Sequence, residues 1–223
     1  MKKTFAAIGI IIAIMACTAT KLQVSYTQQD WQPKKYNKLA VLALANSDPN
    51  RLVLEEAIAE KFTSSGVTAI STFNIFPLAA RKDVLADMTF TKEEMEEHIK
   101  NTVKKFNIDA LMIVSILNTQ TTQRYVSETV GYGGYYNPAW PVYNYNYYDY
   151  YYYAYNTTHT TGYYTTETTY QVETNLYDVE SEKLIWTGIT KTAGMTSIES
   201  EAPKFAKIVV WDVLGKKVVI ADK

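Results

Sequence analysis

The chain is poor in cysteine, in histidine and in net charge. It contains one cysteine and two histidines among 223 residues, which excludes a disulfide framework and nearly excludes a Cys/His metal site within one chain. Its 22 basic and 23 acidic side chains almost cancel, which argues against a nucleic-acid-binding protein built on bulk positive charge. The sequence also has no Gly-x-Ser-x-Gly, His-Glu-x-x-His or phosphate-loop motif. This length is typical of one domain of ordinary size.

The first sixteen residues have the features of a secretory signal. Lys2 and Lys3 form a basic start, and residues 4–13 are an apolar run too short for a permanent membrane span. Ile14-Met15-Ala16-Cys17 then resembles a bacterial lipobox, in which the cysteine sulfur accepts a diacylglycerol group. The sequence therefore predicts that residues 1–16 are removed and that Cys17 becomes the acylated first residue. The alternative is an ordinary signal peptide in which Cys17 is incidental.

The residues after the cysteine predict a location in the cell and a linker to the folded domain. Several acyl chains at Cys17 would anchor the protein firmly in a membrane, because a single chain binds only marginally. Residue 18 is threonine and not aspartate. By resemblance to the sorting rule of enteric bacteria, we expect the bacterial outer membrane, with the domain facing the periplasm. Residues 17–35 are polar, and we interpret them as a mobile tether between the lipid and the domain. No later stretch reaches 18 consecutive apolar residues.

The apolar pattern predicts a single α/β domain over residues 36–223. Short apolar runs without helical spacing predict three buried strands, at 38–44, 67–71 and 110–117. Helices are expected between them. The first begins at Asp48-Pro49 and ends at Gly66, and the second begins at a capping box over residues 91–94. This β-α-β-α-β order implies parallel strands joined by helical crossovers.

The second half of the domain predicts antiparallel strands. Residues 119–130 and 164–178 alternate in the manner of half-exposed strands, and residues 184–192 return as the second arm of a hairpin. A last helix is expected over 197–214, followed by a short edge strand at 218–220. The predicted fold class is therefore α/β, a mixed β-sheet with about three helices and a long tyrosine-rich insertion.

The insertion, residues 131–162, is the most unusual segment of the sequence. Residues 132–155 contain twelve tyrosines in 24 positions, and the insertion has no Leu, Ile, Lys or Arg. A tyrosine ring with a hydroxyl is well suited to recognition surfaces, whereas stacking on nucleic acid also needs interleaved basic residues. We therefore interpret the aromatic residues as a candidate binding arm, and a hairpin tip without function is the alternative. The arm consists of Tyr132, Tyr135, Tyr136, Trp140, Tyr143, Tyr145, Tyr147, Tyr148, Tyr150, Tyr151, Tyr152, Tyr153 and Tyr155.

No catalytic constellation stands out in the sequence. His98 lies beside the predicted buried stripe of its helix, and His159 lies at the edge of the insertion without a fixed neighbour. The acidic residues at 93–97 suit a helix start, and Glu199 and Glu201 have the same explanation. We therefore expect neither an enzyme nor a bound cofactor or metal. A hydrolase that brings distant carboxylates together is the remaining catalytic alternative.

The order of elements, together with one hairpin, carries a family resemblance. The lipobox, the strand that follows Asp109-Ala110, and the hairpin Asn175-Leu176-Tyr177-Asp178-Val179-Glu180-Ser181-Glu182-Lys183-Leu184-Ile185-Trp186 resemble those of small bacterial envelope lipoproteins. The domain is similar to the curli-secretion lipoprotein, the penicillin-binding-protein activators and the amino-terminal domain of TolB. This resemblance covers residues 36–220 and implies a fold, not a function.

These patterns together favour a non-catalytic, lipid-anchored envelope lipoprotein. It would act as a binding or assembly module for another envelope component, through its sheet edge, its tyrosine-rich arm or both. One alternative is a self-associating structural subunit of an envelope or secretion assembly. The other is a binder of glycan or peptidoglycan. The expected partners are the membrane, through Cys17, and an envelope protein or glycan. A homo-oligomer is possible, and no nucleic acid is expected.

Overall fold

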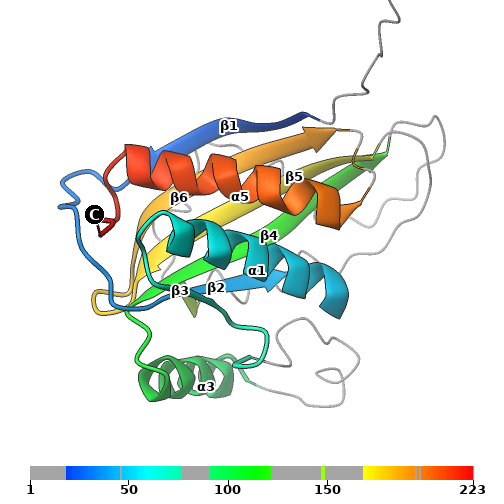
Figure 1. Ribbon diagram of the computed structural model, residues 1–223. Coiled ribbons are helices and arrows are strands. Elements are labelled where there is room, and N and C mark those ends of the chain that lie inside the picture. The colour runs from blue at the N-terminus through cyan, green and yellow to red at the C-terminus, as the bar shows by residue number, and fades with distance from the viewer. Residues whose placement is uncertain are drawn as a thin grey trace, which may run out of the picture.

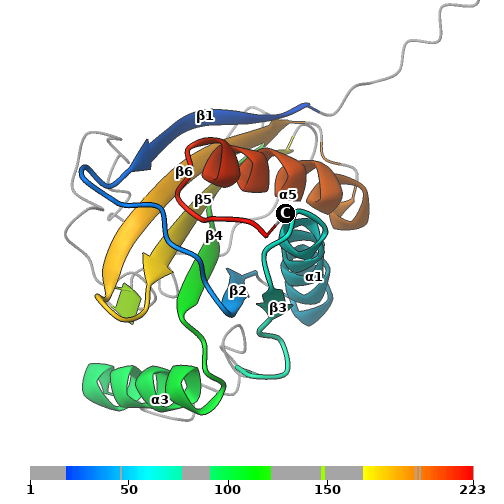
Figure 2. The ribbon, with the colours of Figure 1, turned by 60° about the vertical axis from the view of Figure 1, so that its left-hand side comes forward.

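The computed structural model describes residues 19–45, 47–76, 91–121, 147–148, 168–193, 195 and 197–222. Six strands form one mixed sheet in the order β1-β6-β5-β4-β2-β3, and three helices pack on it (Figures 1 and 2). The strands are β1 (Ala19–Thr27), β2 (Leu39–Leu44), β3 (Ala69–Ser71), β4 (Ala110–Thr121), β5 (Thr168–Asp178) and β6 (Lys183–Ala193). The helices are α1 (Asp48–Ser64), α3 (Lys92–Lys105) and α5 (Ile198–Gly215). The predicted α/β fold class is confirmed. None of the described helices is long and apolar enough to cross a membrane.

The first half of the domain has the predicted parallel arrangement. Strand β2 pairs in parallel with both β3 and β4. The connecting helices begin where the sequence indicates. The Ser47 hydroxyl accepts a hydrogen bond from the Asn50 amide at the start of α1. At the start of α3, Thr91 and Glu94 form a complete capping box.

The helices cover the sheet unequally. Helices α1 and α5 pack on one face, here called the first face, where Ile58, Phe62 and Val209 meet β2, β4, β5 and β6. Helix α3 packs on the opposite, second face, where Ile99 and Val103 join the cluster formed by β2 and β4 (Figure 2). Burying apolar surface on both faces explains why β2 is apolar throughout and does not alternate.

The predicted hairpin of β5 and β6 is confirmed. The two strands pair antiparallel along their full length, and β5 also pairs antiparallel with β4. Trp186 is fully buried on β6, and its indole nitrogen donates to the Asp212 carboxylate of α5 at 2.8 Å. The indole lies against Gly188, where a Cβ atom would stand 2.5 Å from the ring. Only glycine leaves room for this tryptophan.

The tether predicted over residues 17–35 is wrong for residues 19–35. Residues 19–27 form β1, which pairs antiparallel with β6 at the edge of the sheet. The chain then crosses the end of the sheet, where the Trp31 indole donates to the Val218 carbonyl and Lys34 forms a bridge with Val219. Strand β1 is polar because one of its edges and part of one face meet water. Polarity was therefore misleading as a sign of a linker.

Two further predictions need correction. Residues 218–220 do not form an edge strand, and only Val219 makes an isolated bridge there. Residues 119–121 do not begin a new strand, because β4 continues to Thr121, and residues 122–130 lie outside the described residues.

Gly66 follows the end of α1, where the sequence predicts that the first helix stops. Its φ of 88° lies in the left-handed region, and it packs directly under the Asp222 carbonyl.

Candidate functional site

Tyr147 and Tyr148, the two described tyrosines of the insertion, are packed inside the domain. They are only 2% and 3% exposed, and their ring centroids lie 3.9 Å apart with their hydroxyls hydrogen-bonded. The Tyr147 ring lies 6.0 Å from that of Tyr177 on β5. Both belong to the apolar cluster of the second face that includes Ile99 and Val103 of α3. These two tyrosines are therefore packed into the domain, and a binding role for the arm as a whole stays a prediction.

The surroundings keep both tyrosine hydroxyls protonated. Burial is the main cause that raises the pKa of Tyr147 and of Tyr148 above the ordinary value. The Lys100 ammonium lies 4.7 Å from the Tyr148 ring centroid, within the range of a cation–π contact. Lys100 also forms ion pairs with Glu96 at 2.6 Å and with Glu182 at 3.7 Å. The tyrosine pair is thus connected to charged groups of α3 and of the β5–β6 turn.

An open pocket of about 510 Å³ lies beside this tyrosine pair. Its volume is in the range typical of sites for small molecules. Its lining combines apolar side chains of α3, of the segment before β4 and of the segment after β5 with charged and amide side chains. The lining residues are Asn37, Lys100, Val103, Lys104, Asn107, Ile108, Asp109, Tyr147, Tyr148, Val179 and Glu182.

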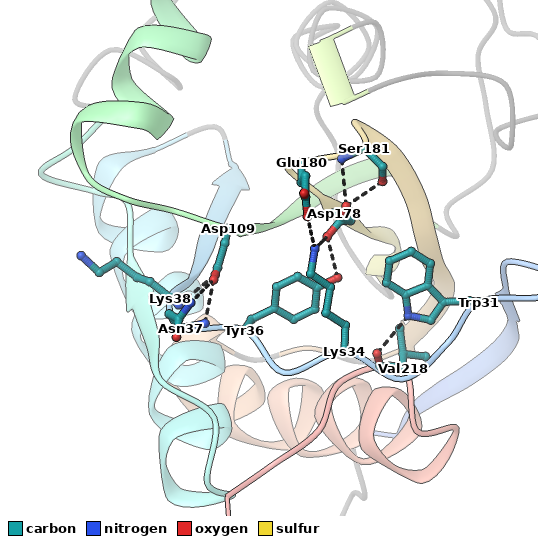
Figure 3. Close-up of polar contacts among 10 residues, drawn as sticks. All are labelled: Trp31, Lys34, Tyr36, Asn37, Lys38, Asp109, Asp178, Glu180, Ser181 and Val218. Atoms are coloured by element: carbon teal, nitrogen blue, oxygen red, sulfur yellow. Dashed lines mark hydrogen bonds and ion pairs between the residues drawn. The ribbon is translucent and has the colours of Figure 1, made fainter.

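Asp109 connects the wall of this pocket to the chain before β2. Its carboxylate accepts hydrogen bonds from the Asn37 amide at 2.7 Å, the Lys38 amide at 2.9 Å and the Asn37 side chain at 3.0 Å (Figure 3). A carboxylate with three such donors is held in one position. Asp109 therefore aligns the starts of β2 and β4.

Asp178 is the second anchored carboxylate at this end of the sheet. It accepts from the Lys34 ammonium at 2.7 Å, from the Tyr36 hydroxyl at 3.1 Å, and from the amide and hydroxyl of Ser181 (Figure 3). Burial by itself would raise the pKa of Asp178, and these hydrogen bonds together hold it below the ordinary value. Burial, together with the same carboxylate, raises the pKa of Tyr36. This cluster ties the chain after β1 to the β5–β6 turn.

The most deeply buried charges belong to a pair that the sequence analysis did not single out. Arg51 and Glu55 of α1 are both completely buried, with the Arg51 Nε 2.8 Å from Glu55 Oε1. The guanidinium also donates to the carbonyls of Phe76 and Thr72, and Glu55 accepts from the Ala43 amide. Their i,i+4 spacing on the apolar face of the predicted helix could have indicated a buried ion pair, because charges on a buried face must be paired inside the protein.

The other acidic candidates have structural roles or lie at the surface. Glu96 pairs with Lys100, and Glu94 belongs to the capping box of α3. Glu201 is buried, and it accepts from Lys204 at 2.8 Å and from the Thr20 hydroxyl at 3.3 Å.

His98 is exposed on α3 with its ring 6.4 Å from that of Phe76. Within the described part of the chain, no group of three or more His, Cys, Asp or Glu residues is placed to hold a metal ion. The other predicted site residues, which are Cys17, Trp140 and the remaining tyrosines of the arm, lie outside the described residues, as does His159.

Comparisons with known proteins show limited likeness. No protein-family model matches the chain, and no curated protein matches its sequence. The structure is similar to a PelC dodecamer from Paraburkholderia phytofirmans, with a TM-score of 0.42, 10% identity, and coverage of 86% of this chain and 96% of that chain. It is also similar to the lipoprotein GNA1162 from Neisseria meningitidis, with a TM-score of 0.38, 10% identity, and coverage of 80% and 98%. Likenesses with TM-scores below 0.5 carry no argument about the family or function of this chain. The resemblance to the curli-secretion, activator and TolB domains stays a prediction.

Proposed function

We propose that this chain is a non-catalytic envelope lipoprotein that binds another envelope component through the pocket beside Tyr147 and Tyr148. The observation that carries this proposal is the pocket itself, whose lining combines apolar side chains with lysine, carboxylate and amide side chains. Such a lining suits an amphipathic ligand, for example a peptide or a glycan. The tyrosine pair closes one wall, and it brings part of the tyrosine-rich insertion to the site.

The position of the pocket supports a role away from the membrane. Strand β1 begins at Ala19, so only Thr18 separates the sheet from Cys17. Ala19 pairs with Ala193 at one end of β6, whereas the β5–β6 turn lies at the other end (Figure 1). Glu182 of this turn lines the pocket, so the pocket lies at that other end. Ten residue steps along β6 correspond to roughly 30 Å. An acylated Cys17 would hold the first end against the membrane, and the pocket would then face the periplasm.

The anchored charged groups support a role without catalysis. Arg51, Glu55, Asp109 and Asp178 are each used in contacts that join one element of the fold to another. Groups used in this way stabilise the fold by holding its elements together. The described pocket instead presents exposed lysines and amides, which are groups that recognise a ligand and hold it.

Charge reversal at the rim tests the pocket. Lys104 lines the pocket, and its neighbour Lys105 does not, so Lys104→Glu and Lys105→Glu form a matched pair. Each variant and the unaltered chain would be crosslinked in native membranes, and their partners would be identified by mass spectrometry. A parallel assay would measure binding to purified peptidoglycan fragments. We expect Lys104→Glu to lose a protein partner or the glycan, and Lys105→Glu to retain it. Equal recovery by the two variants would contradict the proposal.

The anchor is tested separately. Cells that express the chain would be supplied with an alkyne analogue of palmitate, and the purified protein would be analysed by intact mass. We expect an acylated protein that begins at Cys17, and no label on Cys17→Ser. Density separation of the membranes would then test whether the protein is located in the outer membrane. An unlabelled wild-type chain would show that the lipobox reading is wrong and would leave the pocket assay unaffected.

The edge of the sheet favours a second candidate function, self-association. In the described part of the chain, β1 pairs with β6 alone, and it exposes 44% of Val24 and 37% of Tyr26. An edge strand with exposed apolar residues can pair with another copy. Light scattering of the purified protein would detect oligomers, and Val24→Lys should dissociate them. A monomer at all concentrations would exclude this candidate.

A further inference from the structure

The charged groups around the pocket beside Tyr147 and Tyr148 differ in whether the protein itself already uses them. Asp109 is used. Its carboxylate accepts hydrogen bonds from the Asn37 amide, the Asn37 side chain and the Lys38 amide (Figure 3). A carboxylate has about four acceptor positions, so these three donors leave little capacity for a ligand.

Glu182, the other carboxylate of the lining, is also paired within the protein. It lies 3.7 Å from the Lys100 ammonium, which pairs with Glu96 at 2.6 Å as well. The same ammonium lies 4.7 Å from the centroid of the Tyr148 ring. Both acidic groups of the lining and one of its two cations are therefore held by neighbouring groups of the fold. A positively charged ligand would have to displace one of these contacts.

Lys104 is the cation of the lining that the protein does not use. It lies one helical turn after Lys100 on α3, so both side chains lie on the same side of the helix and both line the pocket. Lys104 is exposed, and among the described residues no group forms an ion pair or a hydrogen bond with its ammonium. The pocket thus presents one positive charge that is available to an anionic group from outside.

Asn107 supplies hydrogen-bond donors near Lys104. It follows the end of α3 with a φ of 52°, in the left-handed region that asparagine adopts more readily than most residues. Its side chain lines the pocket, and its amide group has no hydrogen-bond partner in the described part of the chain. A lysine ammonium together with an amide NH₂ group can donate to the two oxygens of an acid group.

The needs of the helix end do not by themselves explain Lys104. A cation in the last turn of a helix is stabilised by the helix dipole, and Lys105 provides one at the same place. Lys105 lies 5.5 Å from the centroid of the Phe106 ring and does not line the pocket. Lys38 donates to the Phe106 carbonyl at 2.8 Å. The end of α3 therefore has two cations besides the one that lines the pocket.

The rest of the lining is apolar or aromatic. Ile108 and Val103 belong to the apolar cluster of the second face, as do the two tyrosines, and Val179 packs against it. A ligand that fills a pocket of about 510 Å³ must cover these side chains with apolar surface of its own. This argues against a bare inorganic anion and favours an organic acid with an apolar body.

We propose that the pocket binds an amphipathic anion, with its acid group against Lys104 and Asn107 and its apolar body against Val103, Ile108 and the tyrosine pair. This inference rests on the proposed function, in which the pocket binds an envelope component, and it names the class of ligand. An acidic peptide segment with apolar side chains has the required chemistry, whereas a neutral glycan lacks the acid group.

A charged dye and its uncharged counterpart test the class of ligand on the full chain. Anilinonaphthalene sulfonate is an amphipathic anion, and phenylnaphthylamine has the same ring system without the acid group. Fluorescence titrations would give the dissociation constant of each dye. We expect the anionic dye to bind more tightly, and Lys104→Met to weaken its binding about fivefold, which is the scale of one exposed ion pair. Added salt should weaken the anionic dye and not the uncharged one, because salt screens exposed charges.

Matched variants locate the effect at the pocket. Lys105→Met removes the same charge from α3 outside the lining and should leave the binding of both dyes unchanged. Asn107→Asp adds a negative charge at the pocket with little change in shape, and it should weaken the anionic dye alone. Asn101→Asp makes the same change on α3 away from the lining and should have no effect. All of these positions are exposed, so the variants should fold, and circular dichroism would check this.

The opposite results would overturn the inference. Tighter binding of the uncharged dye would show that the pocket suits a neutral ligand, such as a glycan. Equal losses in Lys104→Met and Lys105→Met would assign the effect to the overall charge of the chain. Binding of the anionic dye that is absent, or that is unchanged in Lys104→Met, would show that this pocket does not hold an anion.

Capture of an envelope partner is a separate readout. If the dyes respond as expected and crosslinking in native membranes captures no partner, the proposed function fails and the class of ligand stands. If a partner is captured and the dyes show no dependence on Lys104, the proposed function stands and this inference fails.

Discussion

Removing the buried guanidinium of Arg51 should weaken the fold severely. Arg51→Met keeps much of the side-chain volume and leaves Glu55 buried without its cation. It also removes the donors to the carbonyls of Phe76 and Thr72, which hold the turn after β3 against α1. Breaking a buried ion pair from one side costs about 3–5 kcal/mol. We expect the free energy of unfolding to fall by this amount.

The loss should be visible in both chemical and thermal unfolding. For a chain of this size, each kcal/mol lowers the melting temperature by about 2–4 °C, so the expected shift is roughly 6–20 °C. Urea unfolding followed by circular dichroism measures the free energy directly. The control is Glu96→Gln, which removes an exposed i,i+4 pair with Lys100 and should cost about 0.3–0.5 kcal/mol.

A double variant separates the charge from the hydrogen bonds. Arg51→Met with Glu55→Met removes both charges, so no uncompensated ion remains buried. The double variant should cost less than the sum of the single variants by about 2 kcal/mol or more. The Ala43 amide still loses its acceptor, so full stability should not return. If Arg51→Met is no less stable than Glu96→Gln, the reasoning about this network is refuted.

Two further predictions concern the backbone and the pH. Gly66→Ala should cost about 1–3 kcal/mol in urea unfolding, because φ is +88° and a Cβ would stand 2.3 Å from the Asp222 carbonyl oxygen. Gly215→Ala, with no atom within 4 Å, should be neutral or slightly stabilising, and equal effects would contradict this account. The pKa of Asp178 is lowered by folding, so its contribution is present above about pH 4 and is lost as the pH falls through the folded pKa. Asp178→Asn should therefore flatten the decline in stability between about pH 5 and pH 2, and an unchanged decline would exclude Asp178 as its source.

The elements that the sequence predicted correctly depend on residues close together in the chain. Asp48-Pro49 predicted the start of α1 correctly, although Ser47 and not Asp48 is the capping residue. Thr91 with Glu94 caps the start of α3 as predicted. The hairpin of β5 and β6 follows from strict alternation on both sides of a short turn. These local patterns predict a helix start or a hairpin whatever other element packs against it.

The features that sequence reasoning missed depend on distant partners. Strand β1 is stable only because β6, more than 150 residues later, pairs with it, and its own residues resemble a linker. Arg51 and Glu55 would be surface charges on an isolated helix, and the turn that ends at Phe76 turns them into a buried network.

For this protein, the sequence by itself determined the α/β class, the helix starts and the antiparallel hairpin, because local hydrogen bonding and periodicity decide these. It also predicts the acylated Cys17. Tertiary structure alone decided which surfaces are buried and which are open. It packed Tyr147 and Tyr148 into the domain and placed a pocket beside them. Burial is a property of the pairing of distant segments, and composition does not encode which segments will meet.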